Sequence, residues 1–332
     1  MRLLPSILTG CIVLSIFFSS CSKHDKSAAP KDEISSEVLA KIEALGFRTN
    51  GVIAKPGGYV VEGDIFLSNE DLNGKNVSDT LRIGKTEQYR TNNLVTGLPR
   101  TITIALSGLS VDYTNAADVA IARYNAQGLR ISFLRVSSGA NITISGFWQA
   151  PDPVTGSILL GSAGFPSGGN PYSQILMNTH PSAYGTSPDV NYMGTVIAHE
   201  VGHCIGFRHT DYMDRSFSCG GSFSNEGAGS EGAVGIPNTP SVADPNSWML
   251  ACTGFGVNRP FNNNDITALH QVYGTCTGND KRMVGGSCQT GTRVLNYCEP
   301  SGLGGYLFVY YHYTWSDGFN SPTYTSMSRT CQ

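Results

Sequence analysis

The stretch His-Glu-Val-Gly-His-Cys-Ile-Gly-Phe-Arg-His, residues 199–209, decides how the rest of the chain is interpreted. His199 and His203 lie four residues apart, so on an α-helix both rings leave the same face one turn apart and can share one metal ion. Glu200 lies beside that face, where its carboxylate reaches a metal-bound water rather than the metal and suits a general base. The spacing therefore predicts a helix over residues 196–205 that carries part of a zinc site.

Gly206 explains how a third ligand reaches the same ion. Glycine adopts positive φ at little steric cost, so this residue can end the helix and turn the chain to bring His209 under the metal. Three neutral imidazoles leave the fourth position of a tetrahedral zinc ion open to water, which is typical of a catalytic site. The alternative is a helix that carries histidines by coincidence, but with 7 histidines in 332 residues chance rarely produces this set of offsets.

This segment resembles the extended zinc signature HExxHxxGxxH of the metzincin clan, and its continuation His209-Thr210-Asp211 resembles the dual-action HEIGH metallopeptidases of bacteria. The resemblance covers residues 101–274 at the level of motifs. It implies an α+β catalytic domain with a twisted mixed sheet, an active-site helix, a methionine-bearing turn below the metal and a C-terminal helix. It also implies a zinc endopeptidase whose partner is a protein or peptide substrate.

Two later segments carry the rest of the resemblance. Ser247-Trp248-Met249-Leu250 matches the methionine turn, in which Met249 would form an apolar floor under the zinc without binding it; an isolated methionine would be interpreted as core packing. Residues 261–273 have the capping residues and spacing of the closing helix. One position departs from astacin-like and serralysin-like metzincins, because Ala251 stands where they carry a tyrosine. Oxyanion stabilisation would therefore come from zinc and from other donors.

The predicted reaction is hydrolysis of a peptide bond. Zinc polarises the scissile carbonyl, while Glu200 takes a proton from the bound water and passes it to the leaving amine. Because metal-bound imidazoles usually donate their second N–H to an oxygen acceptor, Asp211 is the candidate that orients a ligand, with Asp214 as the second choice.

The first 34 residues have the composition of a targeting sequence followed by a tether. The apolar stretch 3–18 leads into Phe18-Ser19-Ser20-Cys21, which resembles a lipobox, so residues 1–20 are expected to be a signal peptide and Cys21 the lipidated first residue. Ordinary secretion with cleavage near Ser20 and a retained transmembrane helix are the alternatives. Residues 21–34 are expected to be a tether. The protein is thus expected to be exported, to the outer membrane or cell surface, or released from it.

Cysteine usage agrees with export. Of nine cysteines, Cys11 leaves with the signal peptide and Cys21 takes lipid, which leaves an odd number. Cys204 lies in the predicted active-site helix between apolar neighbours and is expected to stay a free thiol. Cys219 and Cys252 are placed to join the loop after the zinc signature to the methionine turn. The remaining four lie in the last fifty-odd residues, where their pairing stays open.

Residues 35–100 are predicted to form a small α+β pro-region. Apolar residues have helical spacing over 33–46, and residues 59–67 read as a strand. Within that strand Val61-Glu62-Gly63-Asp64-Ile65 resembles the F-x-G-D-I segment through which astacin pro-segments place an aspartate on the zinc. Asp64 is therefore a candidate latch that displaces the catalytic water, and the alternative is an ordinary Gly-Asp turn. Activation of such a latch needs a cut after Asp64, and the stretch 85–100 is the expected place.

The predicted catalytic domain, residues 101–274, shows strand, helix and strand patterns in turn. Strands are expected over 102–106, 130–136 and 141–148, with a helix capped by Thr114 between the first two. The resemblance places an edge strand that lines the cleft within residues 162–177, where a peptide would be held by main-chain hydrogen bonds; edge protection by Pro166 is the alternative reading of that region.

Residues 275–332 hold four cysteines and an aromatic run over 306–315, so a small disulfide-bonded β appendage is expected. Its aromatic side chains raise a competing hypothesis for the whole protein, a catalytically weak adhesive or glycan-binding surface lipoprotein on a metzincin scaffold. The intact Glu200 argues against that hypothesis, because a degenerate site would be free to lose this carboxylate.

Bulk composition excludes other classes. A formal charge of −3 and a pI near 6.2 give no basic face for nucleic acid. No glycine-rich loop with an attached lysine suggests nucleotide binding. One catalytic Zn²⁺ is the expected cofactor; calcium and the oligomeric state are left open.

Overall fold

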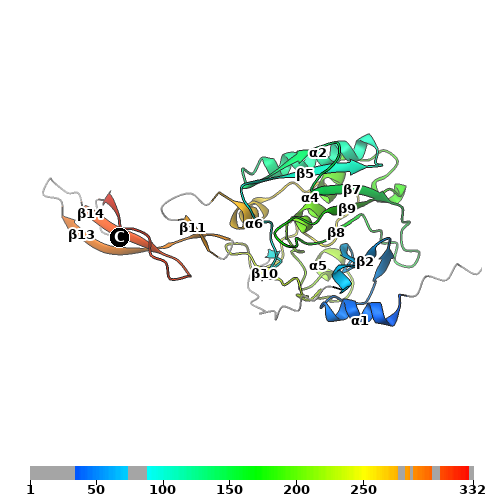
Figure 1. The fold of residues 1–332 in the computed structure, drawn as a ribbon, viewed down its shortest axis with the longest axis horizontal. Helices are drawn as coiled ribbons and strands as arrows, with labels where there is room; N and C mark the ends of the chain where they lie inside the picture. Colours follow the sequence, from blue (N-terminus) through cyan, green and yellow to red (C-terminus); the bar gives the residue numbers. More distant parts are fainter. Residues whose placement is uncertain (1–33, 74–87, 276–280, 285–286, 301–306, 329–332) are drawn as a thin grey trace, which may run out of the picture. The chain divides into compact units, whose positions relative to one another are not determined.

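Eight strands form one mixed sheet that positions the residues of the zinc signature (Figure 1). The computed structural model describes residues 34–73, 88–275, 281–284, 287–300 and 307–328, and all structural statements concern these residues. The strand order is β1-β2-β3-β8-β9-β7-β5-β6. The bounds are β1 (Ile53–Lys55), β2 (Gly58–Val61), β3 (Ile65–Ser68), β5 (Arg100–Ser107), β6 (Ile131–Arg135), β7 (Ile142–Phe147), β8 (Gly161–Ala163) and β9 (Gln174–Asn178).

Strand direction divides this sheet into two parts. β6, β5, β7 and β9 run parallel, whereas β8 runs antiparallel to β9. β3 joins β8 in parallel through the single pair Ile65 and Ala163, and β2 and β1 continue as antiparallel neighbours. The stretch predicted to be a pro-region thus extends the sheet of the predicted catalytic domain. The α+β class with a mixed sheet is confirmed.

Regular alternation of apolar residues located the strands correctly. The predicted strands and the apolar run at 175–177 correspond to β5, β6, β7 and β9. The prediction of one strand over residues 59–67 was wrong, because the polar trio at 62–64 interrupts the alternation and the chain turns there into the β2–β3 hairpin. In that turn Glu62 and Gly63 have φ of 52° and 96°.

Two long helices, α2 (Val111–Asn125) and α4 (Val190–Cys204), pack against each other (Figure 1). The Tyr124 hydroxyl of α2 donates to the carbonyl oxygen of Ala198 in α4 at 2.8 Å. Ser110, and not the predicted Thr114, occupies the N-cap position of α2. The other helices are α1 (Ser36–Ala44), α3 (Pro181–Tyr184), α5 (Ser216–Cys219), α6 (Asn263–Tyr273) and the 3₁₀ helix η1 (Asp71–Asn73).

Two separate clusters of buried apolar side chains hold these elements together. The larger cluster includes Ile102 of β5, Tyr124 of α2 and Val201 of α4. The smaller one joins α1 to β2 and β3 through residues such as Ile42, and its one member from beyond residue 73 is Phe165. Residues 34–73 therefore have a small core of their own, to which the larger part contributes Phe165; β3 and polar contacts such as the Ser230 N–H to the Leu45 carbonyl oxygen also join the two.

The disulfide between Cys219 and Cys252 is confirmed, with Cα atoms 5.1 Å apart. It ties α5 to the stretch that follows the methionine turn. Cys204 is a buried free thiol, as predicted. Tyr89–Arg90 (β4) and Val234–Gly235 (β10) form a further small two-stranded sheet.

The C-terminal stretch forms strands, in agreement with the predicted β appendage. It contains a two-stranded and a three-stranded antiparallel sheet, and the three-stranded sheet includes the aromatic run where it is described. Cys288 is disulfide-bonded, while the pairing of the other cysteines there lies outside the described side chains. The strands are β11 (Lys281–Val284), β12 (Ser287–Thr290), β13 (Thr292–Pro300), β14 (Leu307–Thr314) and β15 (Tyr324–Ser328).

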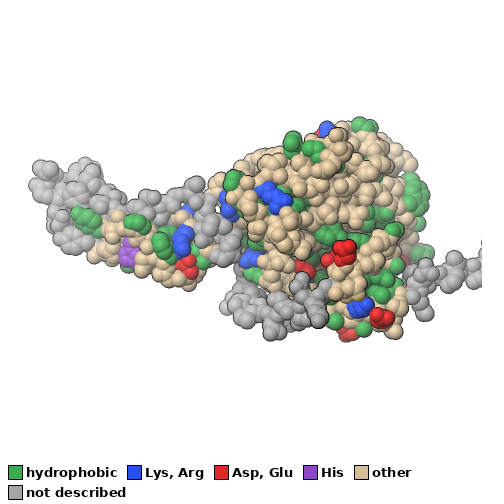
Figure 2. Space-filling view, in the orientation of Figure 1, with side chains coloured by type: hydrophobic (Ala, Val, Ile, Leu, Met, Phe, Trp, Pro, Cys, Tyr) green, Lys and Arg blue, Asp and Glu red, His purple; other side chains and the backbone are tan. Residues whose placement is uncertain are grey.

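The predicted signal peptide and the lipidation candidate Cys21 lie outside the described residues. Within the described part of the chain, no helix is both long enough and apolar enough to cross a membrane. On the face drawn in Figure 2, acidic and basic side chains are scattered over the surface.

Candidate metal centre

Helix α4 begins at Val190 and not at the predicted residue 196. The Asp189 carboxylate accepts hydrogen bonds from two backbone N–H groups of the first turn, at 2.7 and 2.9 Å, and so caps the helix. The last helical residue is Cys204, one residue before the predicted end. The final two turns of the helix carry His199, Glu200 and His203, all of them buried.

The chain turns at Gly206 as predicted. Gly206 has a φ of 103°, a conformation in which a residue with a side chain is strained. The Phe207 N–H donates back to the carbonyl oxygen of Gly202 at 2.9 Å, which closes the end of the helix. This turn returns the chain beneath α4 and brings the buried ring of His209 to the two rings of the helix.

The three imidazoles converge on one point together with Asp64. The Nε2 atoms of His199 and His203 are 3.0 Å apart. The Asp64 Oδ2 lies 3.0 Å from the Nε2 of His209 and 3.3 Å from that of His199, and 4.0 Å from that of His203. These four residues form a buried group in which one atom of each lies within 4.8 Å of the others.

Each ring is held from behind by an oxygen atom. The Nδ1 of His199 bonds to the carbonyl oxygen of Trp248 at 2.8 Å, and the Nδ1 of His203 to that of Phe207 at 2.9 Å. Because a carbonyl oxygen only accepts, both Nδ1 atoms carry the proton and both Nε2 atoms present a lone pair. The Nδ1 of His209 bonds to the Glu226 carboxylate at 2.6 Å.

This donor set fits a zinc ion. Two lone pairs that face each other at 3.0 Å repel unless a cation lies between them. A tetrahedral zinc ion with bonds of about 2.0 Å to nitrogen separates its ligand atoms by about 3.3 Å, which is close to the separations within this group. Imidazole nitrogen and carboxylate oxygen are both ordinary zinc ligands.

The charges and burial of these residues also favour a positive charge within the group. Burial opposes a charge on His209, but Asp64 and Glu226 outweigh it and raise the pKa of His209 well above its usual value. Burial and the two neighbouring imidazoles hold the pKa of His203 well below its usual value. Burial opposes ionisation of Asp64, yet the histidines hold its pKa well below the usual range. A proton on His209 or a metal cation can supply that charge.

Glu200 lies beside this group with one oxygen unused. Its Oε2 atom is buried and has no hydrogen-bond partner among the described residues. Burial, and then the charge of Asp64, raise the pKa of Glu200 well above its usual value. Gly161 of β8 lies directly against it, since a Cβ atom at residue 161 would fall 2.6 Å from the Glu200 Oε1. The strand expected to line the site is therefore β8, with β3 added to its edge.

The methionine turn lies under α4. Met249 is buried, and its Sδ atom is so close to Gly202 that a Cβ atom at residue 202 would fall 2.5 Å from it. The Thr210 N–H donates to the Met249 carbonyl oxygen at 2.8 Å, so the turn also supports the segment that carries His209. The arrangement agrees with an apolar floor below the histidine rings.

A buried carboxylate of α6 fastens this turn. Asp265 Oδ2 accepts from the Trp248 N–H at 3.3 Å and from the Asn262 N–H at 3.0 Å, the latter as part of the capping box of the helix. Asp265 Oδ1 accepts from the Gln88 side chain at 2.9 Å. Burial raises the pKa of Asp265 to about 7.

A family model described as "Dual-action HEIGH metallo-peptidase" matches residues 59–273, more than half of the chain. The chain belongs to the dual-action HEIGH metallopeptidases. A metallopeptidase of this family is a hydrolase that acts on proteins or peptides, and the group of Asp64 with three histidines is its candidate metal site. The match begins upstream of Asp64 and so includes the β2–β3 turn.

Solved structures similar to this HEIGH metallopeptidase include two of myroilysin. "Structure of myroilysin" is 16% identical, with 56% of this chain and 98% of that chain covered and a TM-score of 0.36. "Crystal structure of myroilysin" is 14% identical, with 60% of this chain and 91% of that chain covered and a TM-score of 0.32. No curated protein matches the chain.

One site residue of this metallopeptidase differs from the sequence-based expectation. Asp211 was the candidate to orient a ligand, but its carboxylate accepts from the Ser218 hydroxyl and from the Ala251 N–H, at 2.5 and 2.9 Å. It fixes the loop after the zinc signature instead of a ring. Asp214, the second choice, accepts from Ser216 and Ser224 in a local turn.

The residue that sequence reasoning missed is Glu226. It lies 17 residues after His209 in a loop rich in glycine and serine, so no helical or strand spacing relates the two. A weak signal existed, because Glu226 is the one carboxylate between Asp214 and Glu231 in the sequence. Only the three-dimensional path of this loop shows that Glu226 contacts the His209 ring.

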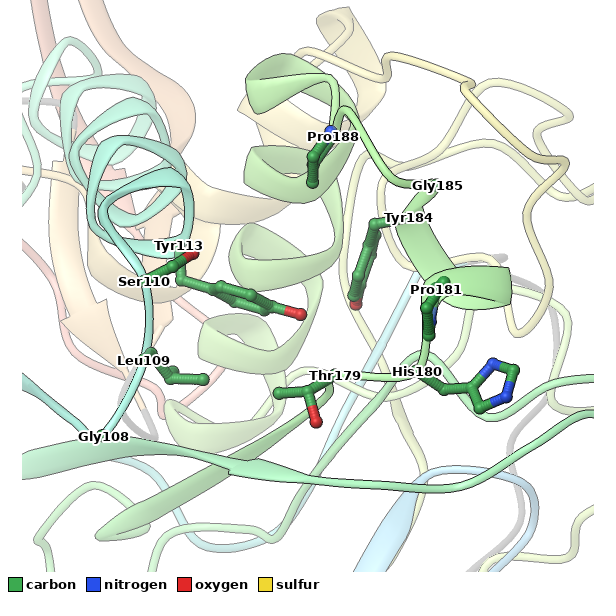
Figure 3. A pocket seen from close by; sticks show the side chains of 10 residues that line it. All are labelled: Gly108, Leu109, Ser110, Tyr113, Thr179, His180, Pro181, Tyr184, Gly185 and Pro188. Atoms are coloured by element: carbon green, nitrogen blue, oxygen red, sulfur yellow. The ribbon is translucent and has the colours of Figure 1, made fainter.

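A separate hollow of about 260 Å³ lies away from the metal group (Figure 3). Its walls come from the start of α2 and from the segment around α3, with the rings of Tyr113 and Tyr184 facing it. None of the three ring ligands, Glu200 or Asp64 lines it. Chemistry therefore belongs to the buried group on α4 and not to this hollow.

Proposed function

We propose that the protein is a secreted zinc endopeptidase in which Glu200 acts as the general base. The observation that carries the proposal is the convergence of three Nε2 atoms, each fixed by an oxygen behind its ring, next to a buried carboxylate with a free oxygen. Such a set holds a metal through His199, His203 and His209 and leaves Glu200 for proton transfer.

The chain's own residues supply binding and proton transfer. When bound, zinc supplies Lewis acidity, which polarises the scissile carbonyl and makes a nearby water more acidic. Glu200 then accepts the proton of the attacking water at its free Oε2 and donates it to the nitrogen of the leaving amine. Burial, and then the charge of Asp64, raise the pKa of Glu200, so its carboxylate takes up a proton more readily than that of an exposed glutamate.

Strand β8 supports the choice of an endopeptidase. β3 shows that an extended segment can pair with β8 immediately beside the metal group, where the Ala163 N–H donates to the Asp64 carbonyl oxygen at 3.1 Å. A substrate held in the same way by main-chain hydrogen bonds would pass the metal in an extended form, so that an internal bond faces Glu200.

Replacing Glu200 by glutamine tests the proposed reaction. The amide has the same shape but cannot take the proton, so hydrolysis of casein should fall by about 10²- to 10⁴-fold while bound zinc stays at the wild-type level. A chelator should abolish wild-type hydrolysis, and added zinc should restore it. Undiminished turnover of Glu200→Gln would mean that another group is the base.

Latency through Asp64 is the second part of the proposal. Its carboxylate oxygen lies 3.0 and 3.3 Å from the Nε2 atoms of His209 and His199, within reach of a metal ion that the three rings would hold, and the segment that carries it has its own small core. A cut after Asp64 would let this module leave, and β8 would become free for substrate. In the uncut chain β3 still covers β8, so the test uses a small hydroxamate in place of casein: uncut zinc-loaded Asp64→Ala should bind it, whereas the uncut wild-type chain should not, and equal binding by the two uncut chains would oppose the latch.

The expected place of that cut, residues 85–100, has to be moved towards Asp64. Arg90 belongs to β4, and the neighbouring Gln88 and Tyr89 are buried, with the Gln88 side chain bonded to Asp265. A cut at Arg90 would detach a strand that supports the methionine turn. We therefore place the cut between Asp64 and Gln88.

Export and lipid anchoring through Cys21 complete the proposal and rest on the lipobox-like sequence. The wild-type protein should fractionate with membranes and incorporate a labelled fatty acid. Cys21→Ser should lose the label and become soluble; an unlabelled wild-type protein would support ordinary secretion instead.

A further inference from the structure

A second carboxylate of the pro-segment fills a pocket next to the metal group. Glu62 precedes Asp64 by two residues, and its side chain is only 1% exposed. Its Oε2 pairs with the Arg208 Nη2 at 3.3 Å, while Arg215 donates to its main-chain oxygen. Glu62 has a φ of 52°, which is unusual for a residue with a long side chain, so the turn is shaped to direct both carboxylates inward.

The walls of this pocket belong to the catalytic part of the chain. Arg208 is buried, and its Nη1 donates to the carbonyl oxygens of Ala228 and Gly232 at 2.6 and 3.0 Å. The Arg215 Nε lies 3.3 Å from the Glu226 Oε1. Neither arginine therefore depends on Glu62 alone for its position, and both would remain beside the metal group after the pro-segment has left.

Charge in the pocket is balanced only while the pro-segment is present. Arg208 pairs with the carboxylates of both Glu62 and Glu226, whereas Arg215 pairs with Glu226 and donates to the main-chain oxygen of Glu62; Glu226 is also bonded to His209. Departure of Glu62 would leave two cations and one carboxylate in a largely buried space. The pocket also has an unused donor, since the Arg208 Nε is buried without a hydrogen-bond partner among the described residues.

We propose that Arg208 and Arg215 form the subsite that selects the substrate, and that it takes a glutamate side chain in the place Glu62 occupies in the precursor. The inference rests on the proposed endopeptidase function. Glutamate is favoured because the Arg208 guanidinium pairs with the carboxylate of Glu62, with Arg215 close by on the main-chain oxygen of the same residue, and because the occupant seen in the pocket has the reach of glutamate.

The preference for glutamate is graded and not absolute. The Glu62 side chain is only 1% exposed and shares Arg208 with the Glu226 carboxylate, so a second carboxylate enters this pocket at a desolvation cost. We expect a preference of about tenfold in kcat/KM for glutamate over glutamine at the selected position, and a larger one over alanine.

Cleavage profiling of the activated enzyme tests the subsite. A mixture of unfolded peptides is digested and the cut sites are mapped by mass spectrometry; glutamate should be enriched at one fixed position near the scissile bond. Arg215 is the arginine to exchange, because its side chain is 18% exposed and that of Arg208 only 1%. Arg215→Glu should shift the enrichment to lysine and arginine, and Arg215→Lys should keep glutamate. Arg135→Glu, on β6 at the opposite edge of the sheet, is the matched control and should leave the profile unchanged.

A binding measurement keeps the test independent of catalysis. A labelled peptide with the sequence of residues 59–68 should bind to the zinc-loaded Glu200→Gln enzyme from which the pro-segment has been removed. A Glu62→Ala peptide should bind at least about tenfold more weakly. Equal binding of the two peptides, or cleavage without glutamate enrichment, would overturn the subsite. Absence of any cleavage together with the expected difference in binding would instead refute the proposed peptidase function and leave the pocket standing.

Discussion

Replacing Glu226 by glutamine should weaken zinc binding by about 10- to 100-fold, because loss of a partner behind a metal-bound histidine has effects of this size. The Glu226 carboxylate lies 2.6 Å from the His209 Nδ1 and is buried. Burial opposes its ionisation, but His209 and the two arginines outweigh burial and lower the pKa of Glu226, so at neutral pH it contributes a full negative charge. Glutamine keeps the acceptor oxygen but removes that charge, and the expected loss corresponds to about 1.4–2.7 kcal/mol of binding free energy.

The same substitution also disturbs the arginines. Arg208 and Arg215 lie 3.7 and 3.3 Å from the Glu226 carboxylate, so Glu226→Gln should lower the unfolding temperature as well. Zinc affinity therefore has to be measured on protein that is still folded. Competition against a chromophoric chelator at 25 °C, with circular dichroism recorded on the same samples, separates the two effects.

Asp211→Asn provides the matched control. Asp211 is a buried carboxylate near the metal group, but it bonds to Ser218 and Ala251 and to no ligand ring. This variant should lose stability and keep its zinc affinity within about threefold of wild type, because only a partner of a ligand ring tunes the metal. If Glu226→Gln binds zinc as tightly as wild type while Asp211→Asn does not, the assignment of Glu226 is wrong.

Two further outcomes test the surroundings of the site. Gly161→Ala places a Cβ atom 2.6 Å from the Glu200 Oε1, so kcat on a peptide substrate should fall at least about tenfold with zinc content unchanged, and an unaltered kcat would show that Glu200 is not confined by β8. Asp265 has its pKa raised to about 7 from a model-compound value of 3.8, so its contribution to stability is present at low pH and is lost as pH rises through about 7. Between pH 4 and 7 the urea midpoint of wild type should therefore fall relative to that of Asp265→Asn, and parallel curves would contradict the raised pKa.

Local chemistry explains what the sequence predicted well. The offset of four between His199 and His203 needs only one helix to place both rings, and the helix exists. Gly206 adopts a positive φ and turns the chain at the end of α4, as predicted. Asn262 caps α6 within the stretch whose residue types predicted the start of that helix. The Cys219–Cys252 disulfide was predicted from the positions of the zinc signature and the methionine turn. The two cysteines lie next to these segments, which have to meet at the metal site.

The remaining features depend on contacts between segments that are distant in sequence. The Asp211 prediction failed because proximity in sequence to His209 was taken as proximity in space, whereas Glu226 reaches the ring from a loop without periodicity. The pairing of β3 with β8, between residues 65 and 163, has no sequence signature at all. The start of α4 was placed too late because only its last turns carry the zinc signature, while the Asp189 cap lies before it.

His209 connects the two features that the proposed pro-segment would control. Its Nε2 faces Asp64, and its Nδ1 is bonded to Glu226, which also pairs with the arginines of the proposed subsite. Departure of the pro-segment would remove one carboxylate from each side of this chain of contacts, Asp64 from the metal group and Glu62 from the arginines. Without Glu62, the Glu226 carboxylate would interact more strongly with the arginines and less strongly with His209. A substrate carboxylate bound in the subsite would restore the balance between these two interactions. Zinc affinity and substrate preference should consequently change together in Glu226 variants. In Gly161 variants a change in one of them should not be accompanied by a change in the other.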